Sequence, residues 1–160
     1  MLNNDYKFYL AFENSNCRDY ITEKFFINSI GHNSDQLNVL PIVMGGHPDD
    51  YRRAAPPNSY IHVDDFKSPA HLAQYLNKLD KDDIAYNQYF EWKSKPRKGE
   101  FVNTYFWCRL CSLLHAPPNR QKPLVSYENI ADWWASKDVC NDGSHKWPNY
   151  FFFPTPLVSL

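Results

Sequence analysis

The residues best suited to chemistry lie near the start of the 160-residue chain, just after a short apolar run at residues 6–12. In a parallel α/β sheet, ligands bind beyond the carboxyl ends of the strands. A helix that follows such a strand begins with free backbone N–H groups and the positive end of its dipole, both of which attract phosphate. Lys24 is placed to reach back to a diphosphate, and Glu23 to accept hydrogen bonds from sugar or ribose hydroxyls. Tyr20 and Asn14 are placed to add stacking and polar contacts.

A plainer interpretation of this glutamate and lysine is an exposed ion pair, which contributes roughly a few tenths of a kcal/mol to an ordinary helix. Two other polar pairs are weaker candidates. Asp64 and Asp65 follow a predicted strand, where adjacent residues point to opposite faces, which favours a structural role over acid/base chemistry or metal binding. Arg52 and Arg53 lie in a predicted connector, where they either help to bind an anion or are simply solvated.

Short apolar runs predict the strands that position these residues, and amphipathic stretches predict helices between them. The strands cover residues 6–12, 39–44 and 60–63. The helices cover residues 19–30, with Asp19 as cap and Gly31 as stop, and residues 69–79, with Ser68 as cap. Strands that alternate with helices imply βαβ units, so we expect an α/β fold with a mainly parallel sheet and flanking helices.

The rest of the chain is predicted to be a connector, a helical part and a tail. Residues 50–59 contain arginines and prolines and are predicted to be a polar connector. Helical spacing appears in three later stretches, at residues 84–92, 101–115 and 127–134. Residues 141–160 mix aromatics with prolines in no clear period and are predicted to be an irregular tail. We therefore expect one domain over residues 1–140 with a helical C-terminal part.

Composition excludes several classes of protein. With 43% hydrophobic and 22% charged residues, the chain suits a globular domain and neither a disordered nor a collagen-like one. The formal net charge of -1 provides no overall positive field for a nucleic-acid backbone or an anionic membrane. No apolar run approaches the roughly 18 residues that span a bilayer. The chain also lacks the glycine-rich fingerprints GxGxxG and GxxxxGK[ST].

The chain contains four cysteines, Cys17, Cys108, Cys111 and Cys140. They could form disulfides in three complete pairings, share one metal site or do neither, and their spacing does not choose among these possibilities. Cys108 and Cys111 fall one turn apart in a predicted helix, where a bridge between them would require local distortion. A zinc site that adds His115, Cys140 and His145 fits no regular ligand spacing well.

Several motifs together resemble a known family. FENS at residues 12–15 and DYITEK at residues 19–24 are similar to the signature of the α-1,3-fucosyltransferases, which transfer fucose from GDP-fucose to glycan acceptors. Three further stretches resemble the same family in the same order, at residues 41–45, 51–66 and 68–79. The resemblance is dense over residues 6–111 and weakens after Cys140.

The resemblance implies a fold and a donor site. The family is a metal-independent GT-B glycosyltransferase of two facing Rossmann-like domains, and the matching part is the C-terminal, GDP-fucose-binding domain. Carried over by motif position, Lys24 would contact the diphosphate of the donor, while Glu23 and Tyr20 would contact the nucleotide or the sugar. Asn14 would line the same pocket. The implied reaction is inverting and needs no cofactor, because Lys24 stabilises the leaving diphosphate in place of a metal ion.

The resemblance also implies parts that we do not find in this sequence. In family members the carboxylate base, an additional phosphate-binding arginine and the acceptor site belong to the other half, so no catalytic residue is expected in this chain. The membrane anchor that family members carry does not precede Met1, although residence in the Golgi lumen is implied. Cys108 and Cys111 match a late CxxC whose cysteines form disulfides, sometimes with partners in the other half.

These expectations describe a partial gene product that binds GDP-fucose, meets its glycan acceptor through the other half and contacts neither nucleic acid nor membrane. General-base catalysis contributes roughly 10²–10⁴-fold, so we expect no useful turnover without that half. Two alternatives remain. One is a non-catalytic GDP-fucose-binding remnant, and the other is an unrelated cytosolic α/β protein with a CxxC zinc site.

Overall fold

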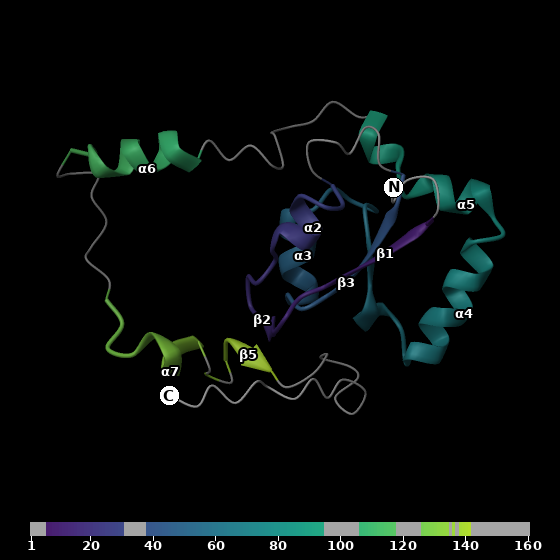
Figure 1. The fold of residues 1–160 in the computed structure, drawn as a ribbon, viewed down its shortest axis with the longest axis horizontal. Coiled ribbons are helices and arrows are strands. Elements are labelled where there is room, and N and C mark those ends of the chain that lie inside the picture. Colours follow the sequence, from purple (N-terminus) through teal and green to yellow (C-terminus); the bar gives the residue numbers. More distant parts are fainter. Residues whose placement is uncertain are drawn as a thin grey trace.

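The computed structural model describes residues 6–30, 38–94, 106–117, 126–134, 136 and 138–141 (Figure 1). Within these residues, parallel strands in the order β1-β3-β4 form the central sheet. Its members are β1 (Phe8–Phe12), β3 (Leu40–Met44) and β4 (Ile61–His62). All three predicted strands are thereby confirmed, as is the α/β class.

The central strand β3 contains a proline at a position where no hydrogen bond is lost. The backbone N–H of Leu40 donates to the carbonyl of Lys7, beside β1, at 2.8 Å. Successive N–H groups of a strand face opposite sides, so the nitrogen of Pro41 faces β4. The pairing with β4 begins only at Ile42, which explains why this sheet tolerates Pro41.

Helices cover both faces of the sheet, α2 (Glu23–Phe26) and α3 (Pro48–Ala54) on one side and α4 (Pro69–Leu79) and α5 (Asp83–Gln88) on the other (Figure 1). Leu40, Ile42 and Met44 point to the side of α4 and α5 and pack in one buried cluster. Val43 points the opposite way and packs with Phe25 of α2. This alternation is why β3 is buried along its whole length.

The predicted connector at residues 50–59 is wrong over its first half, because α3 forms there. His47 caps this helix: its side chain accepts from the backbone N–H of Asp49, and Asp50 accepts from the backbone N–H of His47. Pro48 occupies the first turn, where a missing N–H costs nothing.

The predicted helix at residues 19–30 is also wrong in its extent and its cap. Only Glu23–Phe26 form the α-helix α2, and Thr22 is the cap. Asp19 takes a left-handed backbone conformation with φ 57°, so the chain turns there and no helix begins. The predicted stop, Gly31, lies outside the described residues.

The later elements agree in part with the predictions. α4 is confirmed with Ser68 as its cap. The predicted helix at 84–92 is split into α5 and the 3₁₀ turn η2 (Glu91–Ser94). Another 3₁₀ turn, η1 (Val63–Asp65), follows β4, and the C-terminal helices are α6 (Phe106–Leu114) and α7 (Ile130–Trp134). Residues 142–160 of the predicted tail lie outside the described part.

A second, unpredicted pair of strands joins the two ends of the described chain. β2 (Asn16–Cys17) pairs antiparallel with β5 (Cys140–Asn141). The two strands lie below the main sheet in Figure 1, with α7 beside them. β5 is therefore held next to the loop that follows β1.

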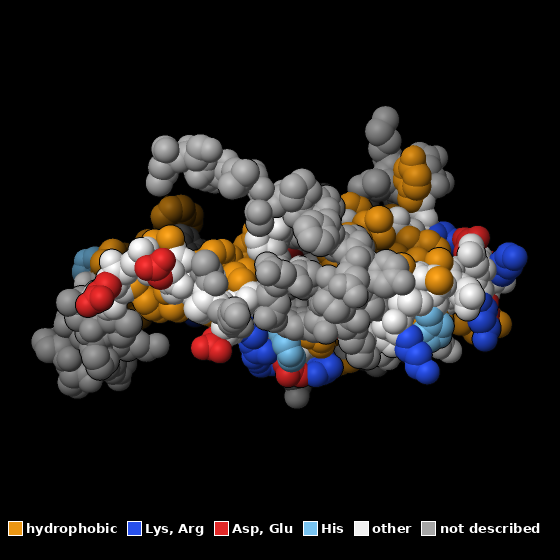
Figure 2. Space-filling model, turned by 90° about the horizontal axis from the view of Figure 1, so that it is seen from below, with side chains coloured by type: hydrophobic (Ala, Val, Ile, Leu, Met, Phe, Trp, Pro, Cys, Tyr) orange, Lys and Arg blue, Asp and Glu red, His pale blue; other side chains and the backbone are white. Residues whose placement is uncertain are grey.

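Among the residues that the structure describes, no helix combines the length and apolar character needed to cross a membrane. On the face in Figure 2, acidic, basic and histidine side chains lie next to one another near the centre.

Candidate functional site

The candidate residues predicted from the sequence lie at the carboxyl end of β1 and in the loop and short helix that follow. Asn14 is exposed just beyond β1, and Tyr20 is half-buried in the loop. Glu23 and Lys24 are the first two residues of α2, and Lys24 Nζ lies 3.5 Å from Glu23 Oε1. Because α2 has only four residues, its dipole adds little, and the side chain of Lys24 is the main attraction for an anion.

Glu13 organises this region, and sequence reasoning gave it no role. Its carboxylate is fully buried at the end of β1. Oε1 accepts a hydrogen bond from the backbone N–H of Thr22 at 2.8 Å, and Oε2 accepts one from the Thr22 hydroxyl at 2.6 Å. Oε2 also lies 3.5 Å from Lys24 Nζ. A carboxylate directly after a predicted strand was the available signal, but the spacing of residues in the sequence does not reveal its hydrogen-bond partners.

Gly45 makes room for this carboxylate side chain. A Cβ at Gly45 would lie 2.3 Å from Glu13 Cβ, and the backbone φ of +137° is one that side-chain-bearing residues rarely adopt. The backbone N–H of Glu13 donates to the carbonyl of Met44 at 2.8 Å. The ends of β1 and β3 therefore meet at a close approach that only glycine allows.

The charges around Lys24 keep its ammonium protonated. Partial burial by itself would lower the pKa of Lys24, but the carboxylates of Glu13 and Glu23 outweigh it and raise the pKa above its ordinary value. The pKa of the Glu23 carboxyl is lowered, mainly by its own backbone N–H and then by the Thr22 hydroxyl and Lys24. With a side chain 24% exposed, Lys24 is a positive charge accessible to an anion.

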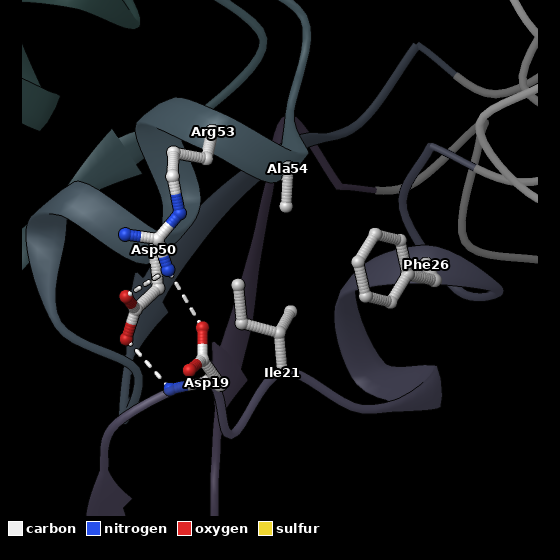
Figure 3. Close-up of a pocket in the computed structure, with 6 residues that line it drawn as sticks. All are labelled: Asp19, Ile21, Phe26, Asp50, Arg53 and Ala54. Carbon is white, nitrogen blue, oxygen red and sulfur yellow. Dashed lines mark hydrogen bonds and ion pairs between the residues drawn. The ribbon is translucent and has the colours of Figure 1, made fainter. Parts of the chain in front are cut away.

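A second buried carboxylate fixes the loop from the side of α3. The Asp50 side chain is only 1% exposed, and its Oδ2 accepts from the backbone N–H of Asp19 at 2.7 Å. Its Oδ1 lies 2.8 Å from an Arg53 nitrogen and 3.5 Å from one of Arg18. Figure 3 shows Arg53 reaching both Asp50 and Asp19. Asp50 therefore anchors the loop that leads to Tyr20.

A pocket of about 210 Å³ lies between this loop and α3, and its lining is drawn in Figure 3: Asp19, Ile21, Phe26, Asp50, Arg53 and Ala54. None of the four predicted donor-binding residues lines it. Arg53 is paired with two carboxylates, and Arg52 pairs with Asp49, so the structure engages both arginines in ion pairs. The pocket thus lies beside the candidate site.

The structure shows a pairing of the cysteines that their spacing in the sequence did not determine. Cys17 and Cys140 form a disulfide. Cys108 and Cys111 are free and exposed, so they do not bridge each other in this structure. Bonds from this pair to another part of a longer protein remain a prediction.

The disulfide also removes a ligand from the zinc alternative, because Cys140 is no longer available as a thiolate. Within the described ranges, no group of three or more His, Cys, Asp or Glu side chains could hold a metal ion.

Comparison with known proteins decides the family. The model of "Glycosyltransferase family 10 (fucosyltransferase) C-term" matches residues 1–133. The chain belongs to glycosyltransferase family 10. The observed parallel sheet with flanking helices is the fold expected for the Rossmann-like C-terminal domain of this family.

Curated relatives of this family carry fucosyltransferase names. The chain is 55% identical over 150 residues, 94% of its length, to glycoprotein 3-alpha-L-fucosyltransferase A of Drosophila melanogaster, of which it covers 28%. It is 45% identical over 129 residues to 4-galactosyl-N-acetylglucosaminide 3-alpha-L-fucosyltransferase FUT6 of Homo sapiens, covering 81% of this chain and 33% of the relative. The chain thus spans a third or less of the length of these relatives.

Proposed function

We propose that this chain is the donor-binding part of an α-1,3-fucosyltransferase and that it binds GDP-fucose, with residues 1–140 forming the donor domain. The 55% identity to a protein named glycoprotein 3-alpha-L-fucosyltransferase A supports this assignment. The observation that carries it is Lys24, an ammonium held by two carboxylates at the carboxyl edge of a parallel sheet, where α/β proteins bind ligands.

Lys24 is assigned to the diphosphate of the donor. A charge-assisted hydrogen bond from an ammonium to phosphate is stronger than one between neutral groups. When the donor binds, its phosphate oxygens lie beside Lys24 Nζ, on the side of the exposed Glu23. The buried Glu13 stays in contact with Lys24 Nζ. Glu13 therefore holds the Lys24 ammonium in place while the positive charge of the lysine is shared with the ligand.

The remaining donor contacts are assigned to the loop around α2. Glu23 accepts hydrogen bonds from hydroxyls of the ribose or the fucose, and the lowered pKa of its carboxyl keeps it ionised for this role. Tyr20 contacts the nucleotide or the sugar, and Asn14 borders the bound donor from the end of β1, outside the pocket drawn in Figure 3.

The reaction that these contacts serve is an inverting, metal-independent transfer. A hydroxyl oxygen of N-acetylglucosamine on a glycoprotein glycan forms a bond to fucose C1. The bond from C1 to the phosphate oxygen breaks, and its electron pair stays on GDP, where Lys24 stabilises the charge. The acceptor proton goes to a base that we assign, with acceptor binding, to the part of the relatives that this chain does not span. We assign the whole enzyme to the Golgi.

Calorimetric titration with GDP-fucose tests the donor site. We expect binding that weakens about tenfold or more in Lys24→Ala, because the variant loses a charge-assisted contact to phosphate. Lys78→Ala, which removes an exposed lysine of α4, is the matched control and should bind as the unmodified chain does. ATP should not compete.

Two results would overturn the proposal. One is a folded chain that shows no binding of GDP-fucose, and the other is binding that Lys24→Ala and Lys78→Ala weaken equally. An assay of fucose transfer with a glycan acceptor addresses the reaction separately, since this chain alone is expected to bind the donor without turnover.

A further inference from the structure

The described residues Trp134, Ser136 and 138–141 are attached to the loop after β1 by several kinds of contact. The Cys17–Cys140 disulfide is the covalent one. The strands β2 and β5 pair antiparallel around it, and the backbone N–H of Arg18 donates to the carbonyl of Val139 at 2.7 Å. We call these described residues, Trp134, Ser136 and 138–141, the strap. Figure 1 shows its strand β5 alongside β2.

The strap also contacts a proposed donor-binding residue through an aromatic side chain. The rings of Trp134 and Tyr20 meet edge to face, with centroids 5.4 Å apart and planes at 81°. Such a pair is favourable beyond the burial of apolar area. Trp134 remains 37% exposed, so it forms one wall beside Tyr20 and does not enclose it.

The loop between Cys17 and Tyr20 is thereby held from two sides. On the side of α3, Asp50 accepts the backbone N–H of Asp19. On the other side, the strap binds Cys17, Arg18 and Tyr20. Asp50 holds the backbone of the loop, whereas Trp134 packs against the ring of Tyr20.

The disulfide reinforces the other contacts of the strap, which are individually weak in the part of the chain that the structure describes. β2 and β5 are strands of two residues each, and an isolated two-stranded ladder of ordinary length is already marginally stable in water. Cys140 lies 123 residues along the chain from Cys17, so ordering the strap is costly without a cross-link. The bond makes the weak contacts of the strap persistent.

We propose that the strap is part of the donor site, with Trp134 as a positioning residue for Tyr20 and the Cys17–Cys140 disulfide as its lock. This proposal rests on the proposed function, because positioning Tyr20 matters only if Tyr20 contacts the donor. Trp134 and Cys140 lie beyond residues 1–133, which the family model matches, so the strap adds a positioning device to the part that the family model describes.

Hydrogen exchange of the 160-residue chain tests the attachment without any donor. In Cys17→Ser/Cys140→Ser, we expect amide exchange over residues 16–20 to rise about tenfold or more, because the loop loses one of its two supports. The matched control Cys108→Ser/Cys111→Ser removes two free cysteines and should leave exchange in this loop unchanged. Unchanged exchange in the first variant would overturn the proposal.

Donor affinity tests the positioning of Tyr20. At a temperature where thermal melts show all variants to be folded, Cys17→Ser/Cys140→Ser should weaken binding of GDP-fucose about tenfold, and Trp134→Ala about threefold. Trp134→Phe keeps an aromatic ring beside Tyr20 and should restore most of the affinity. Since Trp134→Ala keeps the disulfide, it remains informative if the serine variant does not fold. Equal affinities of Trp134→Ala and Trp134→Phe would exclude a role in positioning.

The two proposals fail in distinguishable ways. If the unmodified chain binds GDP-fucose and Lys24→Ala weakens it, the donor site stands, and unchanged affinity in both strap variants overturns the strap alone. If the unmodified chain does not bind, the donor site fails and the strap fails with it as part of that site. The exchange data then still show whether the strap holds the loop.

Discussion

The carboxylate of Glu13 accepts two hydrogen bonds from Thr22, one from its backbone N–H at 2.8 Å and one from its hydroxyl at 2.6 Å. Thr22 is at the same time the cap of α2. The end of β1 and the start of α2 are therefore fixed to each other. This also fixes the positions of the next two residues, Glu23 and Lys24. The geometry of the proposed donor site depends on this pair of the buried Glu13 and the half-buried Thr22.

Removing the Thr22 hydroxyl should destabilise the fold. In Thr22→Val, one buried oxygen of Glu13 loses its hydroxyl donor and α2 loses its cap, so we expect the free energy of unfolding to fall by about 1–3 kcal/mol. Urea unfolding measures the change. Thr22→Ser keeps the hydroxyl and is the control. Equal stability of the valine and serine variants would contradict the role given to this contact.

Substitution of Gly45 should be far more harmful than substitution of Gly46. An alanine Cβ at Gly45 would lie 2.3 Å from Glu13 Cβ on a backbone with φ +137°, whereas at Gly46 its nearest neighbours are side-chain atoms of Ile21 and Tyr51 at 3.1 Å. We expect Gly45→Ala to cost at least about 2 kcal/mol and to weaken binding of GDP-fucose. Thermal melts of the two alanine variants make the comparison, and equal melting temperatures would be inconsistent with this account.

The elements that the sequence predicted well are those whose signals are local. The strand β3 is a continuous apolar run, and α4 begins with the serine and proline that commonly start a helix, Ser68 and Pro69. The helix α3 was missed because histidine is not a usual cap residue. His47 acts as the cap here, and Asp50 completes the capping box by accepting a hydrogen bond from the backbone N–H of His47.

The candidate site divides in the same way. Glu23 and Lys24 could be identified from a short motif, because neighbours in sequence are neighbours in α2. The role of Asp50 could not be identified from a local motif, since its hydrogen bond to Asp19 joins residues 31 positions apart. The Cys17–Cys140 pairing spans 123 positions, and four cysteines offer no local pattern that selects it.

The contribution of Lys24 to donor binding should not change over the neutral pH range. Its pKa is raised above the ordinary value of 10.5, so the ammonium is fully charged below that value and loses its charge only as the pH rises through the higher, folded-state pKa. We expect the ratio of affinities between the unmodified chain and Lys24→Ala to be constant from about pH 6 to about pH 9. Calorimetry at several pH values measures it. A ratio that declines within this range would indicate a lowered pKa instead.

Neutralising Asp50 should release the loop that carries Tyr20. In the structure, Asp50 Oδ2 accepts from the backbone N–H groups of Asp19 and His47, and Oδ1 is paired with Arg53. Asp50→Asn keeps one oxygen and replaces the other with an NH₂ group. The N–H groups of this amide then face donors. We expect a loss of about 2 kcal/mol in unfolding free energy and faster amide exchange at Asp19. Asp49→Asn changes a neighbouring carboxylate that is half-exposed and paired with an exposed arginine, so its unfolding midpoint should stay unchanged. If the two variants unfold at the same midpoint, Asp50 does not anchor the loop, and the ion pair of Arg53 with Asp19 and the contacts of the strap then hold it.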